Sequence, residues 1–224
     1  MSAISLTADT RTLEQKLDAM ERFTETYRRH LGAPSAIREA ECLKCQLPDR
    51  LAPLQRGDRF GARIHYLPIG FAAQTIGDRF GYYLDEDTIR AWMENAGAAQ
   101  RGRLQALIGF WSTEHSTHLA KKSFPAETAK ALHSDAWTED SGIAFPLYRM
   151  AGALLDYDKL LTLGVPGLRA LVEGGKARAL DEGADVSLFD GMLMAVDIFA
   201  DSCRFYRDDA SEKAAAAASE AERT

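Results

Sequence analysis

Apolar residues recur at spacings of three and four along much of the chain, which is the period of one face of an α-helix. The pattern is clearest over residues 186–208, where the stripe comprises Phe189, Met192, Val196, Phe199, Cys203 and Tyr206. Ser187 and Asp190 have the spacing of a capping box at the start of this helix. The apolar arc is widened by Leu188, Leu193, Ala195 and Ile198. We therefore expect a helix that is buried between neighbouring elements.

A second clear amphipathic helix is expected over residues 10–31. Its apolar face comprises Leu13, Leu17, Met20, Phe23, Tyr27 and Leu31. An apolar stripe of this kind must be covered by another element. We therefore predict that Phe189, Met192, Val196, Phe199 and Cys203 are buried together against Leu17, Met20 and Phe23.

The same period predicts several further helices. One is opened by Pro34 and ended by Pro48, and a pair of helices after residue 155 is separated by the Gly164–Pro166 break. The expected ranges are 35–47, 85–97, 100–122, 125–133, 156–163 and 166–180. An acidic loop is expected over residues 134–142.

Between residues 51 and 84 the period changes to two, which is typical of strands. Apolar residues alternate first at Phe60, Ala62, Ile64 and Tyr66, and again at Phe80, Tyr82 and Leu84. These segments predict a short β-hairpin near residues 58–84. The fold class is therefore mainly α, with residues 1–208 as a single helical domain. Residues 209–224 form an Ala-rich polar helical tail and are the expected truncation point.

Charge and composition narrow the function classes. The net charge of −6 and the lack of a Lys/Arg-rich run count against a nucleic-acid-binding protein. No apolar run approaches the roughly 18 residues of a membrane span, and the first residues do not resemble a signal peptide. Three cysteines do not make a disulfide framework. We expect a cytoplasmic protein with free thiols and no membrane partner.

Two motifs could carry metal or redox chemistry, and each has a simpler interpretation. Cys42 and Cys45 lie one helical turn apart without a second pair, which favours structural thiols. His115 and His118 with Glu114 could bind a metal, but the HExxH order is missing, which favours a polar turn. A helical enzyme with a metal site at 114–118 remains one hypothesis for the function.

Two segments carry a family resemblance that extends over nearly the whole chain. They are DYDKLLTLGVPGL at Asp156–Leu168 and the FxxMLMAxDxFxxxxxFY helix at Phe189–Tyr206. With the preceding PSAIREAECLKCQLP and LQRGDRFGARI segments, they resemble the N-terminal region of glycyl radical enzymes of the pyruvate formate-lyase family. The resemblance implies the multi-helix N-terminal region of that α/β-barrel fold.

The resemblance also implies what is missing. The family's formate acetyltransferase-like lyases and dehydratases use a glycyl radical near the C-terminus and a thiyl cysteine, and neither motif is found in this chain. It implies a fragment, split subunit or degenerate paralogue that is not catalytic alone and holds no cofactor. An S-adenosylmethionine-dependent activating enzyme would install the radical on the missing part. The implied partner is the remainder of such an enzyme or a second copy of this chain, docked on leftover apolar surface.

Arg149, Asp156 and Tyr157 form the polar cluster that we predict near a substrate of the assembled enzyme. A guanidinium suits a carboxylate or sulfonate, and a carboxylate suits a hydroxyl. The simpler interpretation makes Asp156 a helix N-cap and Arg149 its ion-pair partner. A stand-alone helical interaction or regulatory protein derived from the family is the alternative function.

Overall fold

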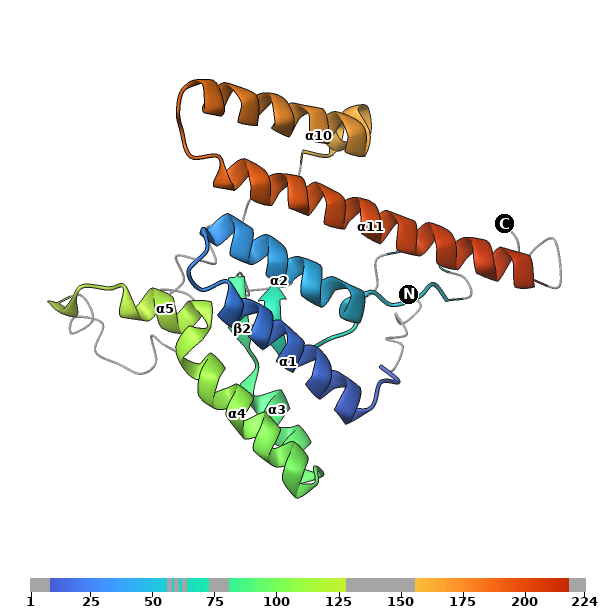
Figure 1. The fold of residues 1–224 in the computed structure, drawn as a ribbon. Helices are drawn as coiled ribbons and strands as arrows, with labels where there is room; N and C mark the ends of the chain where they lie inside the picture. Colours follow the sequence, from blue (N-terminus) through green and yellow to red (C-terminus); the bar gives the residue numbers. More distant parts are fainter. Residues whose placement is uncertain are drawn as a thin grey trace. The chain divides into compact units, whose positions relative to one another are not determined.

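The computed structural model describes residues 9–55, 58, 61, 64–72, 81–127 and 156–217. Within these residues the chain is mainly helical, with one small antiparallel sheet, as predicted (Figure 1). The chain divides into two compact units. Unit 1 comprises Met1–Glu25 and Leu67–Leu155, and unit 2 comprises Thr26–Tyr66 and Asp156–Thr224. The boundary falls inside α1 (Leu13–Arg29).

The apolar face of α1 forms much of the core of unit 1. Thr12 and Gln15 begin the helix with a capping box, in which each side chain accepts the other's backbone N–H, at 2.8 and 3.2 Å. Phe23 is 1% exposed, and its ring stacks on that of Trp111 from α4 (Ala98–Glu114) at a centroid distance of 5.5 Å. The predicted face of the first helix is thus confirmed at its centre, whereas Leu31 is exposed.

The sheet pairs β1 (Ile69–Ala72) with β2 (Gly81–Leu84), with Ile69 opposite Leu84. The ring of Tyr82 on β2 lies 5.9 Å from that of Trp111, so the sheet covers the aromatic core. The predicted hairpin is confirmed in its second strand, but the first strand lies later than expected. Of the alternating residues in the predicted first strand, Phe60 and Ala62 lie outside the described residues, and Ile64 makes an isolated bridge to Leu51.

Among the described residues of unit 1, the sheet is followed by α3 (Glu86–Glu94), α4 and α5 (Ser116–Lys122). The Asp85 carboxylate caps α3 by accepting the Thr88 N–H at 3.1 Å. The prediction of one helix over 100–122 is wrong, because the backbone becomes extended at His115. The break places the Ser116 hydroxyl where it accepts the N–H of Tyr82 on β2, at 2.8 Å. Of the helix predicted at 125–133, residues 128–133 lie outside the described residues.

In unit 2, α11 (Ser187–Ala216) packs on α2 (Ser35–Arg50) and on α10 (Tyr157–Asp181), and it lies between them (Figure 1). The contact with α2 is close at Gly191, where an added Cβ would lie 2.7 Å from the carbonyl oxygen of Ala36. On the other side, Arg169 and Lys176 of α10 pair with acids of α11, namely Asp197 and Asp190. Ion pairs therefore join α10 to α11, while α11 approaches α2 closely at Gly191 and Ala36.

Local signals in unit 2 were partly misleading. The predicted break after Leu163 is confirmed, since Gly164 has φ of 59°, in the left-handed region that favours glycine. The helix predicted to end at Pro48 continues to Arg50, because a proline near a C-terminus removes only one bond of the final turn. The predicted capping box of Ser187 and Asp190 does not form: Ser187 bonds to Asp185, while Asp190 bonds to Lys176.

The predicted burial of the apolar stripe on α11 is wrong. Phe199 is 43% exposed, and Met192 and Cys203 are exposed as well, while Leu17, Met20 and Phe23 belong to the core of unit 1. The buried residues of α11 are Gly191 and Ile198, on the side toward α2. Helical periodicity identifies an apolar face but not the side that packs, and here a glycine marks that side. The helix also continues past residue 208, into the predicted tail, as far as Ala216.

Candidate functional site

The predicted substrate cluster is divided between described and undescribed residues. Arg149 lies outside the described residues. Asp156 begins α10, where its carboxylate accepts the Lys159 N–H at 2.9 Å and lies 3.1 Å from the Lys159 ammonium. These hydrogen bonds lower the pKa of Asp156, so the carboxyl group is ionised at neutral pH. Tyr157 is exposed. Asp156 is thus an N-cap, as the simpler interpretation proposed, and a role toward a substrate stays a prediction.

The candidate metal residues lie at the junction of α4 and α5. The rings of His115 and His118 are 6.0 Å apart, and the His118 backbone N–H donates to Nδ1 of His115 at 3.4 Å. Nδ1 of His115 therefore accepts a backbone N–H in the first turn of α5. Within the described parts of the chain, no group of three or more His, Cys, Asp or Glu residues is placed to hold a metal ion.

The three cysteines are free thiols in different environments. Cys42 is buried, Cys45 is half-buried and Cys203 is exposed. The first two share α2 and the third lies on α11. The CLKC segment is therefore a pair of helical thiols, and their structural role stays a prediction.

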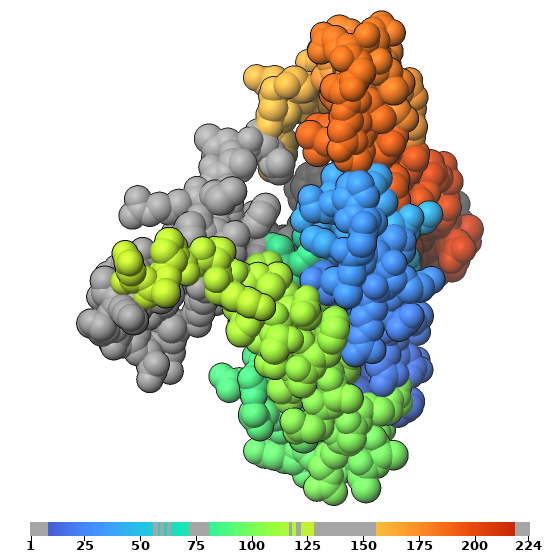
Figure 2. Space-filling model, turned by 60° about the vertical axis from the view of Figure 1, so that its left-hand side comes forward, coloured from blue at the N-terminus to red at the C-terminus, as the bar shows by residue number. Residues whose placement is uncertain are grey.

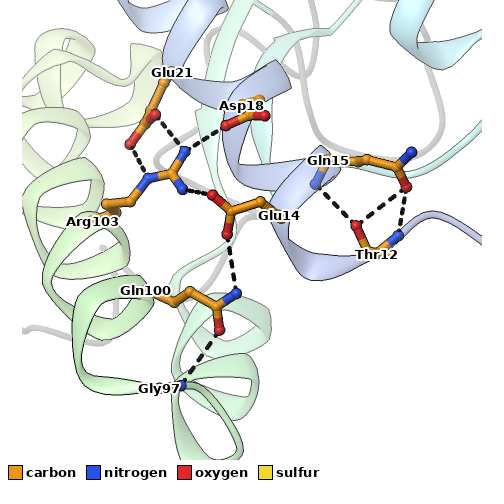
Figure 3. Close-up of polar contacts among 8 residues, drawn as sticks. All are labelled: Thr12, Glu14, Gln15, Asp18, Glu21, Gly97, Gln100 and Arg103. Carbon is orange, nitrogen blue, oxygen red and sulfur yellow. Dashed lines mark hydrogen bonds and ion pairs between the residues drawn. The ribbon is translucent and has the colours of Figure 1, made fainter.

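A charged cluster that the sequence analysis missed joins α1 to α4 in unit 1 (Figure 3). Arg103 donates to both carboxylate oxygens of Glu21, at 2.8 and 2.7 Å, and to Asp18 at 2.6 Å. It also bonds to Glu14, which accepts from Gln100 at 3.1 Å. The hydrogen bonds from Gln100 and Arg103 lower the pKa of Glu14. One guanidinium thus holds three carboxylates, which makes the cluster a clamp between two helices.

Most of the exposed large apolar side chains among the described residues lie on α10 and α11. On α10, large side chains are exposed at Tyr157, Leu161, Leu163, Leu171 and Leu180. On α11, exposed residues follow one helix face, and we call them the α11 stripe: Leu188, Met192, Ala195, Phe199 and Cys203. In Figure 2, α10 and α11 appear in orange and red at the surface of unit 2. Exposed apolar surface of this kind is typical of an interaction site.

The α11 stripe is separate from the contacts that α11 makes inside unit 2. Gly191 and Ile198 mark the side toward α2, whereas Asp190 and Asp197 mark the side toward α10. The stripe residues follow one another at intervals of four, three, four and four, so they lie on a third side. This side is exposed to solvent.

Comparisons with protein-family models, with curated proteins and with solved structures found no match. Among the described helices, none is both long enough and apolar enough to cross a membrane.

Proposed function

We propose that this chain is the helical N-terminal portion, or a split subunit, of a glycyl radical enzyme of the pyruvate formate-lyase family. Its role is assembly, and the radical chemistry belongs to a complementary chain that carries the barrel, the thiyl cysteine and the radical glycine. One observation carries the proposal. The two segments that resemble the family, Asp156–Leu168 and Phe189–Tyr206, include exposed large apolar side chains on α10 and α11.

The exposed residues of α10 are the best candidates for contact with the complementary chain. Leu161 is 81% exposed, and it lies with Leu163 in the turns before the Gly164 kink. Burying a leucine side chain contributes roughly 1.5–3 kcal/mol. A chain that covers Leu161, Leu163 and their neighbours on α10 would therefore gain several such contributions. This gain supports a role in assembly.

In the assembled enzyme, Arg149, Asp156 and Tyr157 are the proposed substrate-facing residues. Asp156 and Tyr157 lie at the start of α10, beside the exposed leucines. The lowered pKa of Asp156 keeps a negative charge there, which suits a hydroxyl donor and not an anionic group. The activating enzyme and S-adenosylmethionine act on the complementary chain. The same exposed surface would also serve the alternative function, a stand-alone helical interaction or regulatory protein.

Electron paramagnetic resonance tests the proposal. The barrel portion of a pyruvate formate-lyase-type enzyme is co-expressed with this chain and incubated anaerobically with the activating enzyme, S-adenosylmethionine and reductant. We expect no glycyl doublet from this chain alone, and a doublet that grows several-fold when both chains are present. A doublet from this chain alone would overturn the proposal. So would a barrel signal that is the same with and without it.

Two matched variants locate the contact. Leu161→Glu places a charge in the proposed interface and should abolish the gain in signal. Leu119→Glu, at an exposed leucine of α5 in unit 1, should leave the gain unchanged. Equal loss in both variants would contradict the assignment of the interface to α10.

A further inference from the structure

We infer that α11 pairs with α11 of a second copy of this chain, in antiparallel orientation, through the α11 stripe. This inference does not rest on the proposed function, which assigns the complementary chain to α10. It rests on the exposure, the spacing and the flanking charges of the stripe. All five stripe residues are exposed, and together they extend over about 22 Å of helix.

The spacing of the stripe is self-complementary. Leu188 and Cys203 lie at equal distances from the midpoint between residues 195 and 196, and so do Met192 and Phe199. A two-fold axis through this midpoint places Leu188 opposite Cys203 of the other copy, and Met192 opposite Phe199. Ala195 lies at the crossing, where a small side chain allows the helices to approach. A two-fold interface requires this self-complementarity, because both copies use the same patch.

The charges beside the stripe favour the antiparallel orientation. Asp185 precedes α11 and Arg207 follows the stripe, and both are exposed. The antiparallel pairing brings Asp185 of one copy within about one helical residue of Arg207 of the other. A parallel pairing would instead place Asp185 beside Asp185 and Arg207 beside Arg207, which is repulsive.

Both groups are exposed, so a second copy can reach them. The Ser187 N–H donates to the Asp185 carboxylate at 2.8 Å, which lowers the pKa of Asp185. Arg207 pairs with the adjacent Asp208 at 2.7 Å, but an exposed pair of this kind contributes little. Arg207 can therefore exchange partners or contact both acids. Each pair of copies would gain two such contacts, one at each end of the stripe.

The small size of the stripe predicts a weak dimer. Stable protein interfaces bury about 800 Å² on each partner, which is more than the five side chains of the α11 stripe offer. We therefore expect self-association at protein concentrations on the order of 10–100 µM. Sedimentation velocity should show a monomer–dimer equilibrium in this range. A chain that remains monomeric at about 100 µM would overturn the inference.

Disulfide trapping tests the orientation. In a Cys45→Ser background, with Cys42 buried, native Cys203 is the exposed thiol. The two Cys203 residues of an antiparallel pair lie about 22 Å apart and should not cross-link. Leu188→Cys adds a thiol opposite Cys203 of the other copy, so mild oxidation should yield at least tenfold more disulfide-linked dimer. Leu180→Cys is the control, since Leu180 and Leu188 are 56% and 58% exposed but Leu180 lies on α10.

Each outcome of the trapping experiment decides the orientation. Rapid cross-linking through Cys203 alone would indicate a parallel pair and overturn the antiparallel model. Equal cross-linking of the Leu180→Cys and Leu188→Cys chains would show random collision, which overturns it too. A sedimentation comparison adds a readout without thiols: Phe199→Glu should weaken association at least tenfold, whereas Leu171→Glu on α10 should not. The test of the complementary chain uses a variant of α10, whereas the test of the dimer uses variants of α11. One proposal can therefore fail while the other holds.

Discussion

The indole N–H of Trp111 donates a hydrogen bond to the Thr24 hydroxyl at 2.8 Å, and so links α4 to α1 inside the core of unit 1. The same hydroxyl donates to the Met20 carbonyl at 2.7 Å. Both side chains are buried, so water cannot replace a lost partner.

Replacing Thr24 by valine should therefore destabilise the fold. The change keeps the shape of the side chain but leaves the buried indole N–H without its acceptor, at a cost of about 1–3 kcal/mol. The control is Thr113→Val, at an exposed threonine of α4 whose hydroxyl bonds to its own helix. We expect it to change the free energy of unfolding by less than about 0.5 kcal/mol. Equal effects in a denaturant melt would contradict the role of the Trp111 contact.

A glycine comparison tests the packing of α11 on α2. Gly191→Ala adds a methyl group 2.7 Å from the Ala36 carbonyl oxygen, so the helices must separate, at about 1–3 kcal/mol. The methyl group added by Gly109→Ala meets no atom within 4 Å. Gly109 lies inside α4, where alanine stabilises the helix by roughly 0.5–1 kcal/mol relative to glycine. The two changes should shift the midpoint of chemical unfolding in opposite directions. A stabilising Gly191→Ala would show that α2 and α11 are not in close contact.

Arg103 holds three acids of α1 that would otherwise repel one another. Arg103→Gln should destabilise unit 1 by about 1 kcal/mol, since the network is partly exposed. The loss should be larger at low salt, where the freed repulsion among the three acids is less screened. Melts in 20 mM and 500 mM NaCl measure this difference. A loss that is independent of salt would indicate packing by the arginine stem and not charge.

Glu39 on α2 should make the fold less stable as the pH rises. Burial raises its pKa, and Arg38 opposes the shift. A raised folded-state pKa means that its stabilising contribution is present below the unfolded pKa and is lost as the pH rises through the folded pKa. Glu39→Gln should therefore be more stable than the native chain at pH 7, and the advantage should vanish near pH 4.

Asp156→Asn is the control for this pH effect, because hydrogen bonds from Lys159 lower the pKa of Asp156. Its contribution is present above the unfolded pKa and is lost as the pH falls, so Asp156→Asn should be less stable than the native chain at pH 7. Urea melts at both pH values give the two differences. Identical pH trends for the two variants would contradict the assigned signs.

Local signals predicted much of the helical fold. The stripe of Leu17, Met20 and Phe23 gave the buried face of α1, and Asp85 marked the start of α3. The kink at Gly164 followed from glycine and proline placement. These features depend on residues close in sequence, so the chain itself specifies them.

Features that depend on distant residues could not be predicted. The helix break at His115 accompanies a hydrogen bond that the Ser116 hydroxyl accepts from Tyr82 on β2, and β1 lacks the alternation that marks a half-buried strand. For the candidate site, the sequence identified the apolar face of α11 but not that α2 and α10 pack on its other sides. The acids at Glu14, Asp18 and Glu21 share a helix face, but nothing local indicates Arg103 as their partner.

The free energy of unfolding of two Phe→Ala variants tests most directly whether the α11 stripe is exposed as an interaction surface or buried in a core. Phe199→Ala and Phe23→Ala are compared by urea unfolding at a protein concentration where sedimentation shows monomer. Phe199 is 43% exposed and Phe23 is 1% exposed. We expect Phe199→Ala to cost less than about 1 kcal/mol and Phe23→Ala about 3–5 kcal/mol. A cost above about 3 kcal/mol for Phe199→Ala in the monomer would show that the stripe is buried within the chain, and would contradict its role as an open docking surface.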